Sequence, residues 1–161
     1  MTDSFDSIPS EYFFEEVKKR FGFLTNYYRF SISSEKVNRD FHFPTISYSF
    51  KDFYLSFSRS RGSHVRVSAG IQNKERKIGF GFGEICYYLD SGNLPSERIY
   101  GYAPNFSWDN PIEQYISKQL NWYAEYLKKN LDRVLDLFFD DANEEKREYL
   151  IVLKRDKIAK L

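Results

Sequence analysis

Hydrophobic and polar residues follow two different periods along this chain, and the change of period divides it into elements. Between residues 10 and 20 the apolar residues recur every three to four positions, which predicts a first helix that ends at Gly22. From residue 28 the period becomes two, the spacing of a strand with one buried face. This period predicts strands at residues 28–32, 46–50, 53–57, 65–71 and 78–82, with a polar loop at 33–40.

The connections between these strands are short, as at Lys51-Asp52, and short connections favour antiparallel neighbours. The alternation predicts that one face of the sheet packs on a core and the other faces water. In the segment 79–83, glycines alternate with phenylalanines. We interpret this segment as a place where another group packs closely, with a ligand or partner groove as the alternative, because it matches no phosphate-binding loop.

The helical period returns near the C-terminus. Asn110-Pro111 followed by Glu113 is typical of a helix start, and the apolar spacing of three to four residues then continues to about residue 139. A short helical turn is expected at 84–89, an irregular loop at 90–109 and a last helix from about residue 141. We expect one α+β domain over residues 1–161, with a five-stranded, mainly antiparallel sheet and with the N-terminal helix and the long C-terminal helices packed on one face.

Composition and charge narrow the class of protein. The 24 Lys and Arg nearly balance the 23 Asp and Glu, so the whole molecule carries no charge that would steer it toward nucleic acid or lipid. No apolar run approaches the roughly 20 residues that cross a bilayer, and the first residues do not resemble a signal peptide. With Cys86 as its single cysteine the chain cannot form an internal disulfide. We expect a cytoplasmic protein that does not enter a membrane.

Residues that could carry catalysis are scarce. His42 and His64 have no acid or base beside them in the sequence, and Cys86 lies among apolar and aromatic residues, as a buried structural thiol does. One cysteine and two distant histidines lack zinc-ligand spacing. We therefore predict no catalytic residue, no metal and no cofactor. An enzyme or small-molecule site remains an alternative, and it would require Glu84, Cys86 and His64 to meet in one pocket.

Two surface features favour binding to another protein. The chain has 16 Phe, 13 Tyr and 2 Trp, and four of these aromatic residues share the 90–109 loop with charged residues, either as a recognition edge or folded back as a lid. Three aspartates four residues apart form a column on the long helix, either a solvated face or a docking surface for a basic partner. The predicted partner-binding residues are Tyr100, Tyr102, Phe106, Trp108, Asp132, Asp136 and Asp140.

The middle of the sheet is basic and supplies another alternative. Residues 51–77 carry seven Lys and Arg against two acidic residues. An RNA-binding module would use this surface, through Arg59, Arg61 and Arg66, although no RNA-recognition motif is present.

The order of features resembles a known group. The residues that carry the resemblance are Val17, Phe21, Phe23-Leu24, Tyr28, Phe30, Ile46-Ser47-Tyr48, Leu55, Arg61-Gly62, Val65-Arg66-Val67 and Gly79 to Gly83, followed by long helices. This layout is similar to that of small bacterial immunity proteins of polymorphic or contact-dependent toxin systems. The resemblance implies a non-enzymatic protein that binds a cognate toxin and blocks it by occlusion. It rests on layout and matches no motif, so it implies no particular site residues.

Overall fold

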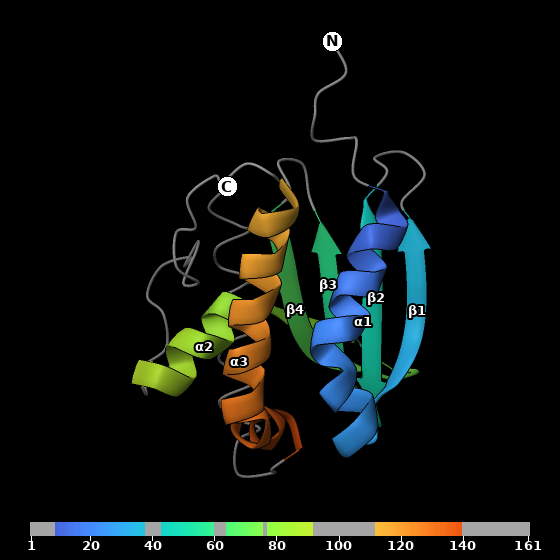
Figure 1. Cartoon of the computed structure of the whole chain (residues 1–161). Coiled ribbons are helices and arrows are strands. Elements are labelled where there is room, and N and C mark those ends of the chain that lie inside the picture. Colours follow the sequence, from blue (N-terminus) through green and yellow to red (C-terminus); the bar gives the residue numbers. More distant parts are fainter. Residues whose placement is uncertain (1–8, 38–42, 60–63, 76, 92–111, 140–161) are drawn as a thin grey trace, which may run out of the picture.

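The computed structural model describes residues 9–37, 43–59, 64–75, 77–91 and 112–139, and it confirms the α+β class (Figure 1). A first helix is followed by five strands, a shorter helix and a long helix. In chain order these elements are α1 (Ser10–Tyr27), β1 (Ser31–Val37), β2 (Pro44–Phe50), β3 (Phe53–Arg59), β4 (Val65–Gln72), β5 (Lys77–Gly81), α2 (Phe82–Ser91) and α3 (Ile112–Phe139).

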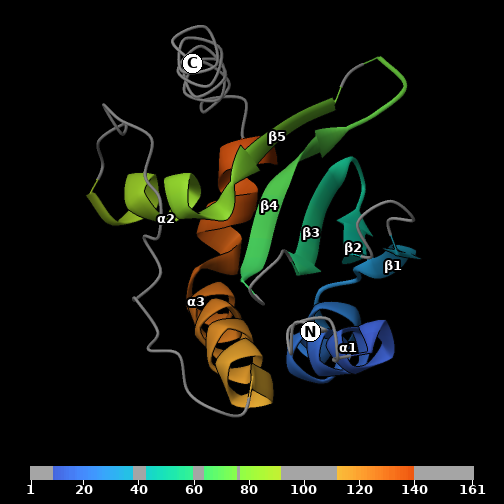
Figure 2. The ribbon, with the colours of Figure 1, turned by 90° about the horizontal axis from the view of Figure 1, so that it is seen from above.

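The five strands form one sheet in the order β1-β2-β3-β4-β5, and every neighbouring pair is antiparallel. Helices α1 and α3 lie side by side on the same face of this sheet, α1 over β1 and β2 and α3 over β4 (Figure 2). We call this the inner face and the opposite side the outer face. The prediction that the first helix and the long helix cover one face is confirmed.

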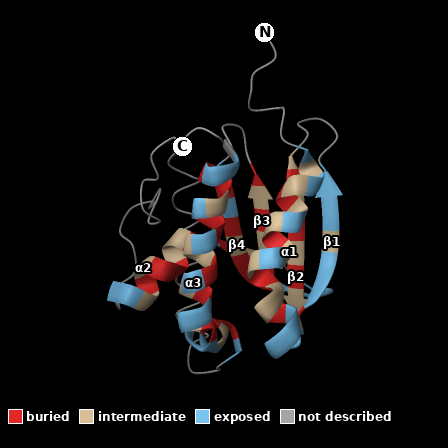
Figure 3. Ribbon diagram, viewed as in Figure 1, coloured by how far each residue is buried: buried red, intermediate tan, exposed pale blue. Residues whose placement is uncertain are grey.

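The core lies between the inner face and the two helices. Strand residues of one parity, such as Leu55 and Phe57, are buried there, and they meet buried residues spaced three to four apart on α1 and α3 (Figure 3). The Phe21 and Phe57 rings have centroids 4.3 Å apart, and those of Phe53 and Phe138 are 5.1 Å apart. The 3.6-residue period of the helices and the two-residue period of the strands therefore converge on one apolar layer.

The first helix is longer than its sequence predicts. Helix α1 continues through Gly22 to Tyr27, because Leu24 is fully buried and its packing outweighs the roughly 1 kcal/mol that a glycine costs inside a helix. The chain turns instead at Arg29, whose φ of 57° is left-handed, and the Phe30 amide donates to the Leu24 carbonyl. The predicted bounds of the first strand, 28–32, were therefore wrong, since β1 starts only at Ser31 and runs through residues 33–37 of the predicted loop. Residues 38–40 of that loop lie outside the described residues.

Strand β1 forms one edge of the sheet and is exposed along most of its length. A register shift between Ile32 and Ser34 interrupts its pairing with β2. Glu35 pairs in register with the buried Ile46, so its carboxylate projects to the inner side, where it forms an ion pair with Lys18 of α1. A bulge and an inward-pointing charge are two devices that keep an edge strand from pairing with another sheet.

The end of the sheet also differs in detail from the prediction. Strand β5 stops at Gly81, and the expected helical turn at 84–89 is the ten-residue helix α2, whose first residue Phe82 is buried. The long helix agrees with its predicted end near residue 139. The predicted loop at 90–109, apart from its first two residues, and the predicted last helix from residue 141 lie outside the described residues.

Candidate functional site

The outer face of the sheet is paved with small polar residues. The strand registers align Ser34, Ser47, Ser56 and Ser68 in one row across β1 to β4, and Gly81 of β5 completes that row. Neighbouring strands are about 4.8 Å apart, so the four serines span about 14 Å. This row has no side chain longer than serine, and it forms a low floor.

The neighbouring row contains a tyrosine that lies flat. Tyr54 pairs in register with Gly70, and Gly70 pairs with Gly79. A Cβ atom added to Gly79 would lie 2.2 Å from the Tyr54 hydroxyl oxygen, so the tyrosine occupies the space that a side chain on β5 would need. Tyr54 is only 9% exposed although it belongs to the outer face. The prediction that the glycine segment permits close packing is confirmed at Gly79.

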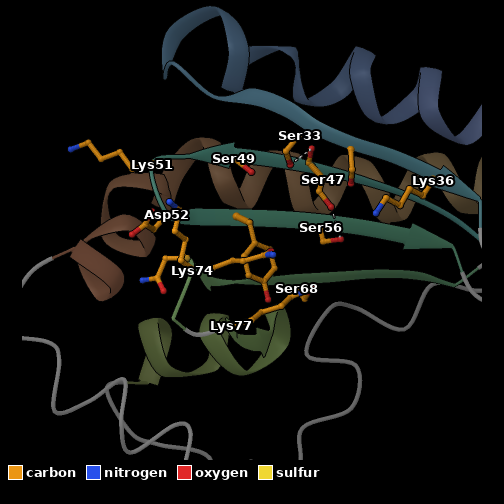
Figure 4. A pocket seen from close by; sticks show the side chains of 14 residues that line it. Ser33, Lys36, Ser47, Ser49, Lys51, Asp52, Ser56, Ser68, Lys74 and Lys77 are labelled. Carbon is orange, nitrogen blue, oxygen red and sulfur yellow. Dashed lines mark hydrogen bonds between the residues drawn. The ribbon is translucent and has the colours of Figure 1, made fainter.

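These rows form the floor of a hollow of about 670 Å³ on the outer face, which we call the serine hollow (Figure 4). No helix or strand among the described residues packs on it. Its lining residues are Ser33, Ser34, Lys36, Ser47, Ser49, Lys51, Asp52, Tyr54, Ser56, Ser68, Gln72, Asn73, Lys74 and Lys77.

The charge of the serine hollow is positive. Four lysines and one aspartate line it, which gives a formal charge of +3. The Lys51 side chain points away from the serines, and its ammonium lies 5.4 Å from the Phe50 ring centroid and 5.8 Å from that of Phe139 (Figure 4). Within the described part of the chain, Lys36, Lys74 and Lys77 form no ion pair, so their charges are available to a ligand.

The hydroxyl groups of the floor are only partly engaged. Ser47 donates to the Ser56 hydroxyl at 3.1 Å, and Ser33 donates to the Ser47 backbone carbonyl at 3.2 Å. A hydroxyl both donates and accepts, and an ammonium only donates. The serine hollow therefore offers mainly donors to a visiting group, which suits carboxylates and other anions. Its described lining residues include no histidine and no cysteine, and a single carboxylate, that of Asp52.

Two residues of the alternative enzyme site, His64 and Cys86, contact different parts of α3. The His64 Nδ1 is 2.9 Å from the Tyr115 hydroxyl, in the first turn of α3. The Cys86 carbonyl instead accepts a 3.4 Å hydrogen bond from Tyr126. Those two tyrosines are eleven positions apart on α3, which is about 16 Å along the helix axis. Burial raises the pKa of the Cys86 thiol to about 12, so the sulfur stays protonated near neutral pH.

The predicted partner-binding residues are only partly visible. Tyr100, Tyr102, Phe106, Trp108 and Asp140 lie outside the described residues. Asp132 and Asp136 are exposed, one turn apart on α3, the helix that packs on the inner face over β4. Arg133, which follows Asp132 on α3, donates to the Asn130 side chain and to the Leu89 carbonyl. The role of the aspartates in binding stays a prediction.

The basic surface proposed for RNA is smaller than expected. Arg59 is only 7% exposed, because it continues the inward parity of Phe53, Leu55 and Phe57 on β3, so its assignment to an exposed basic surface was wrong. Arg66 is exposed on the outer face, whereas Arg61 lies outside the described residues, as does His42.

Outer-face aromatic groups are also scarce. Among the described residues that line the serine hollow, Tyr54 is the one aromatic residue, and it is buried. Proteins that bind single-stranded RNA on a sheet stack bases on exposed aromatic rings. The described outer face offers no such platform. The serine hollow itself was missed from the sequence, although alternate serines in three strands were its signal.

No group of three or more His, Cys, Asp or Glu side chains is placed to hold a metal ion among the described residues. None of the helices in the described ranges combines the length and the hydropathy that crossing a bilayer requires. No protein-family model, no curated protein and no solved structure matches this chain.

Proposed function

We propose that this protein is a non-enzymatic binding domain that recognises an acidic surface of another protein through the serine hollow. The observation that carries the proposal is the set of lysines around an open polar floor, Lys36, Lys74 and Lys77, which have no carboxylate partner within the described residues. Unpaired like charges around one hollow repel each other, and a complementary anionic surface relieves that repulsion.

A protein partner fits the serine hollow better than RNA does. The floor provides hydroxyl groups in place of exposed aromatic rings, so it can hydrogen-bond carboxylates but cannot stack bases. The site extends over all five strands, so it is broad enough to contact the surface of a folded protein partner. Because the hollow is polar, we expect affinity to depend on salt and on charge complementarity rather than on a large apolar contact.

The test uses a defined acidic probe, a fluorescent 20-residue oligo-glutamate peptide, with binding followed by anisotropy. The double variant Lys36→Glu/Lys74→Glu should weaken binding by about tenfold or more, since reversing two charges removes two attractions and adds two repulsions. The control Lys19→Glu/Lys129→Glu changes the net charge equally, at exposed lysines of α1 and α3. It should change affinity by less than about twofold.

Two results would overturn this proposal. Equal losses in the two double variants would mean that the probe senses only net charge. Tighter binding of a 20-nucleotide oligo-uridylate than of oligo-glutamate, with that binding lost in Lys36→Glu/Lys74→Glu, would assign the serine hollow to RNA.

We propose in addition that the protein partner is the toxin of a polymorphic or contact-dependent system, and that this protein acts in the cytoplasm as its immunity protein. The resemblance in the order of elements supports this role, and the serine hollow suits a toxin with an acidic surface. Co-expression with a toxin-like domain encoded by the adjacent gene tests it. The wild-type chain and the Lys19→Glu/Lys129→Glu control should protect the cells, and Lys36→Glu/Lys74→Glu should not. Full protection by both double variants would refute the involvement of the serine hollow.

A further inference from the structure

We infer that Lys77 is the anchoring cation of the serine hollow and that Tyr54 and Gly79 hold it in position. This inference rests on the proposed function and assigns unequal roles to the lysines of one site. Lys77 would make the lasting contact with a partner carboxylate, whereas Lys36 and Lys74 would attract the partner from a distance. These unequal roles follow from the contacts that each lysine side chain makes within the protein itself.

Tyr54 is fixed by its neighbours on the next two strands. The register places Gly70 directly opposite Tyr54 and Gly79 one strand further, so the tyrosine side chain lies across β4 and β5. The Tyr54 hydroxyl oxygen lies 2.2 Å from where a Cβ of residue 79 would be, and the side chain is 9% exposed. Alanine at position 79 would displace the ring. Glycine at this position is therefore a requirement for the flat ring and not merely tolerated.

The flat ring in turn holds Lys77. The ammonium of Lys77 lies 5.4 Å from the centroid of the Tyr54 ring, within the range of a cation–π contact. Lys36 and Lys74 have no ion pair and no aromatic contact within the part of the chain that the structure describes. A lysine loses much rotamer freedom when it is immobilised on binding, and a lysine that is already held loses less.

A lysine that is already held in position and a mobile lysine affect different rate constants of binding. A mobile charge at the rim of a site mainly accelerates association, and a charge held in the contact mainly slows dissociation. For the serine hollow this assigns slow dissociation to Lys77 and fast association to Lys74. Tyr54 is a positioning residue, because it acts on the partner through Lys77.

The experiment measures association and dissociation rates of the 20-residue oligo-glutamate probe by stopped-flow fluorescence. Tyr54→Leu removes the ring but keeps every charge, and it should raise the dissociation rate by about two- to fivefold, the worth of an exposed cation–π contact. Tyr54→Phe keeps a ring and should restore most of the slow dissociation. Lys77→Met should raise the dissociation rate at least as much as Tyr54→Leu, and Lys74→Met should mainly lower the association rate. Lys129→Met, on α3, is the control for a lost lysine.

Gly79→Ala provides an independent route to the same effect. Because Gly79→Ala displaces the ring, it should show the same dissociation rate as Tyr54→Leu, provided that circular dichroism shows an intact fold. If Gly79→Ala does not fold, Tyr54→Leu alone tests the inference. Unchanged dissociation in Tyr54→Leu, or equal effects of Lys77→Met and Lys74→Met on both rates, would overturn the anchoring role while leaving the proposed function standing. If the wild-type chain does not bind the oligo-glutamate probe at low salt, the proposed function itself is refuted.

Discussion

The contact between Gly70 and β5 gives the sharpest stability prediction for this fold. A Cβ atom on Gly70 would lie 1.8 Å from the Ile78 carbonyl oxygen, whereas real Cβ atoms essentially never come within 3.0 Å of another heavy atom. That oxygen belongs to the backbone of the neighbouring strand, so no side-chain rotation can relieve the clash. Gly70→Ala must therefore separate β4 and β5 locally by about 1.2 Å, the difference between those two distances.

The magnitude follows from the hydrogen bonds that this separation breaks. An N–H···O distance near 2.9 Å that grows by about 1 Å is no longer a hydrogen bond. Losing two hydrogen bonds between β4 and β5 costs about 1–3 kcal/mol. Alanine also lowers the conformational entropy of the unfolded chain, which offsets about 0.4–1 kcal/mol of that loss. We expect the free energy of unfolding to fall by about 1 kcal/mol, or Tm by about 2–4 °C for a chain of this size.

Gly81→Ala is the matched control. Gly81 lies on the same face, and an added Cβ would have no atom within 4 Å. It should leave stability unchanged or raise it by up to about 1 kcal/mol. Urea unfolding followed by circular dichroism, with the slope m compared between variants, measures both effects. A Gly70→Ala variant within about 0.5 kcal/mol of wild type, or an equal loss in both variants, would refute the clash argument.

Three further predictions concern buried polar groups. The Gln119 side chain accepts a buried 2.9 Å hydrogen bond from the Val65 amide, so Gln119→Leu should cost about 1–3 kcal/mol in urea unfolding, and a loss below about 0.5 kcal/mol would contradict this. Cys86 is fully buried and its pKa is raised to about 12, so an aromatic disulfide reagent at pH 8 should label it only in denaturant; rapid labelling of the native protein would count against its burial. Burial also raises the pKa of Tyr48 to about 12. The folded state keeps protons on both groups that the unfolded chain releases at high pH. Their contribution to stability is therefore complete below about pH 8 for Cys86 and below about pH 9 for Tyr48, and it is lost as the pH rises toward 12, by up to about 1.4 kcal/mol per pH unit and group. Urea midpoints at pH 7, 9 and 10.5 should fall in that order, and a constant midpoint would exclude this linkage.

The sequence predicts those elements of the fold that bury one face and expose the other. The alternation in residues 53–57 and the helical spacing in α3 both reflect a buried stripe, and the structure agrees with both. Strand β1 gave no such signal because it is an edge strand exposed on both sides, and so its residues 33–37 resembled a loop.

Parity could have corrected one error before the structure did. Arg59 shares the odd positions of Phe53 and Phe57, which point inward, whereas Arg66 alternates with Val65 and Val67 and points outward. The basic surface predicted from charge counts alone ignored this difference.

The serine hollow could not be predicted in the same way. Its floor depends on three strand registers, which place Ser34 beside Ser47 and, two strands further, Ser68. Alternation along one strand says which face a serine occupies but not which serine of another strand lies next to it. The flat position of Tyr54 depends on Gly79, 25 positions away in the sequence, through contacts that no local pattern contains.

The guarded edge at β1 limits how this molecule can associate. The register shift between Ile32 and Ser34 and the Glu35–Lys18 ion pair on the inner side of the strand make this edge a poor template for a visiting strand. Recognition through the open face makes no demand on the visitor's own architecture, so an all-helical partner would qualify as readily as one built of strands. Divergence of a partner's fold would then leave recognition intact as long as its pattern of carboxylates persisted.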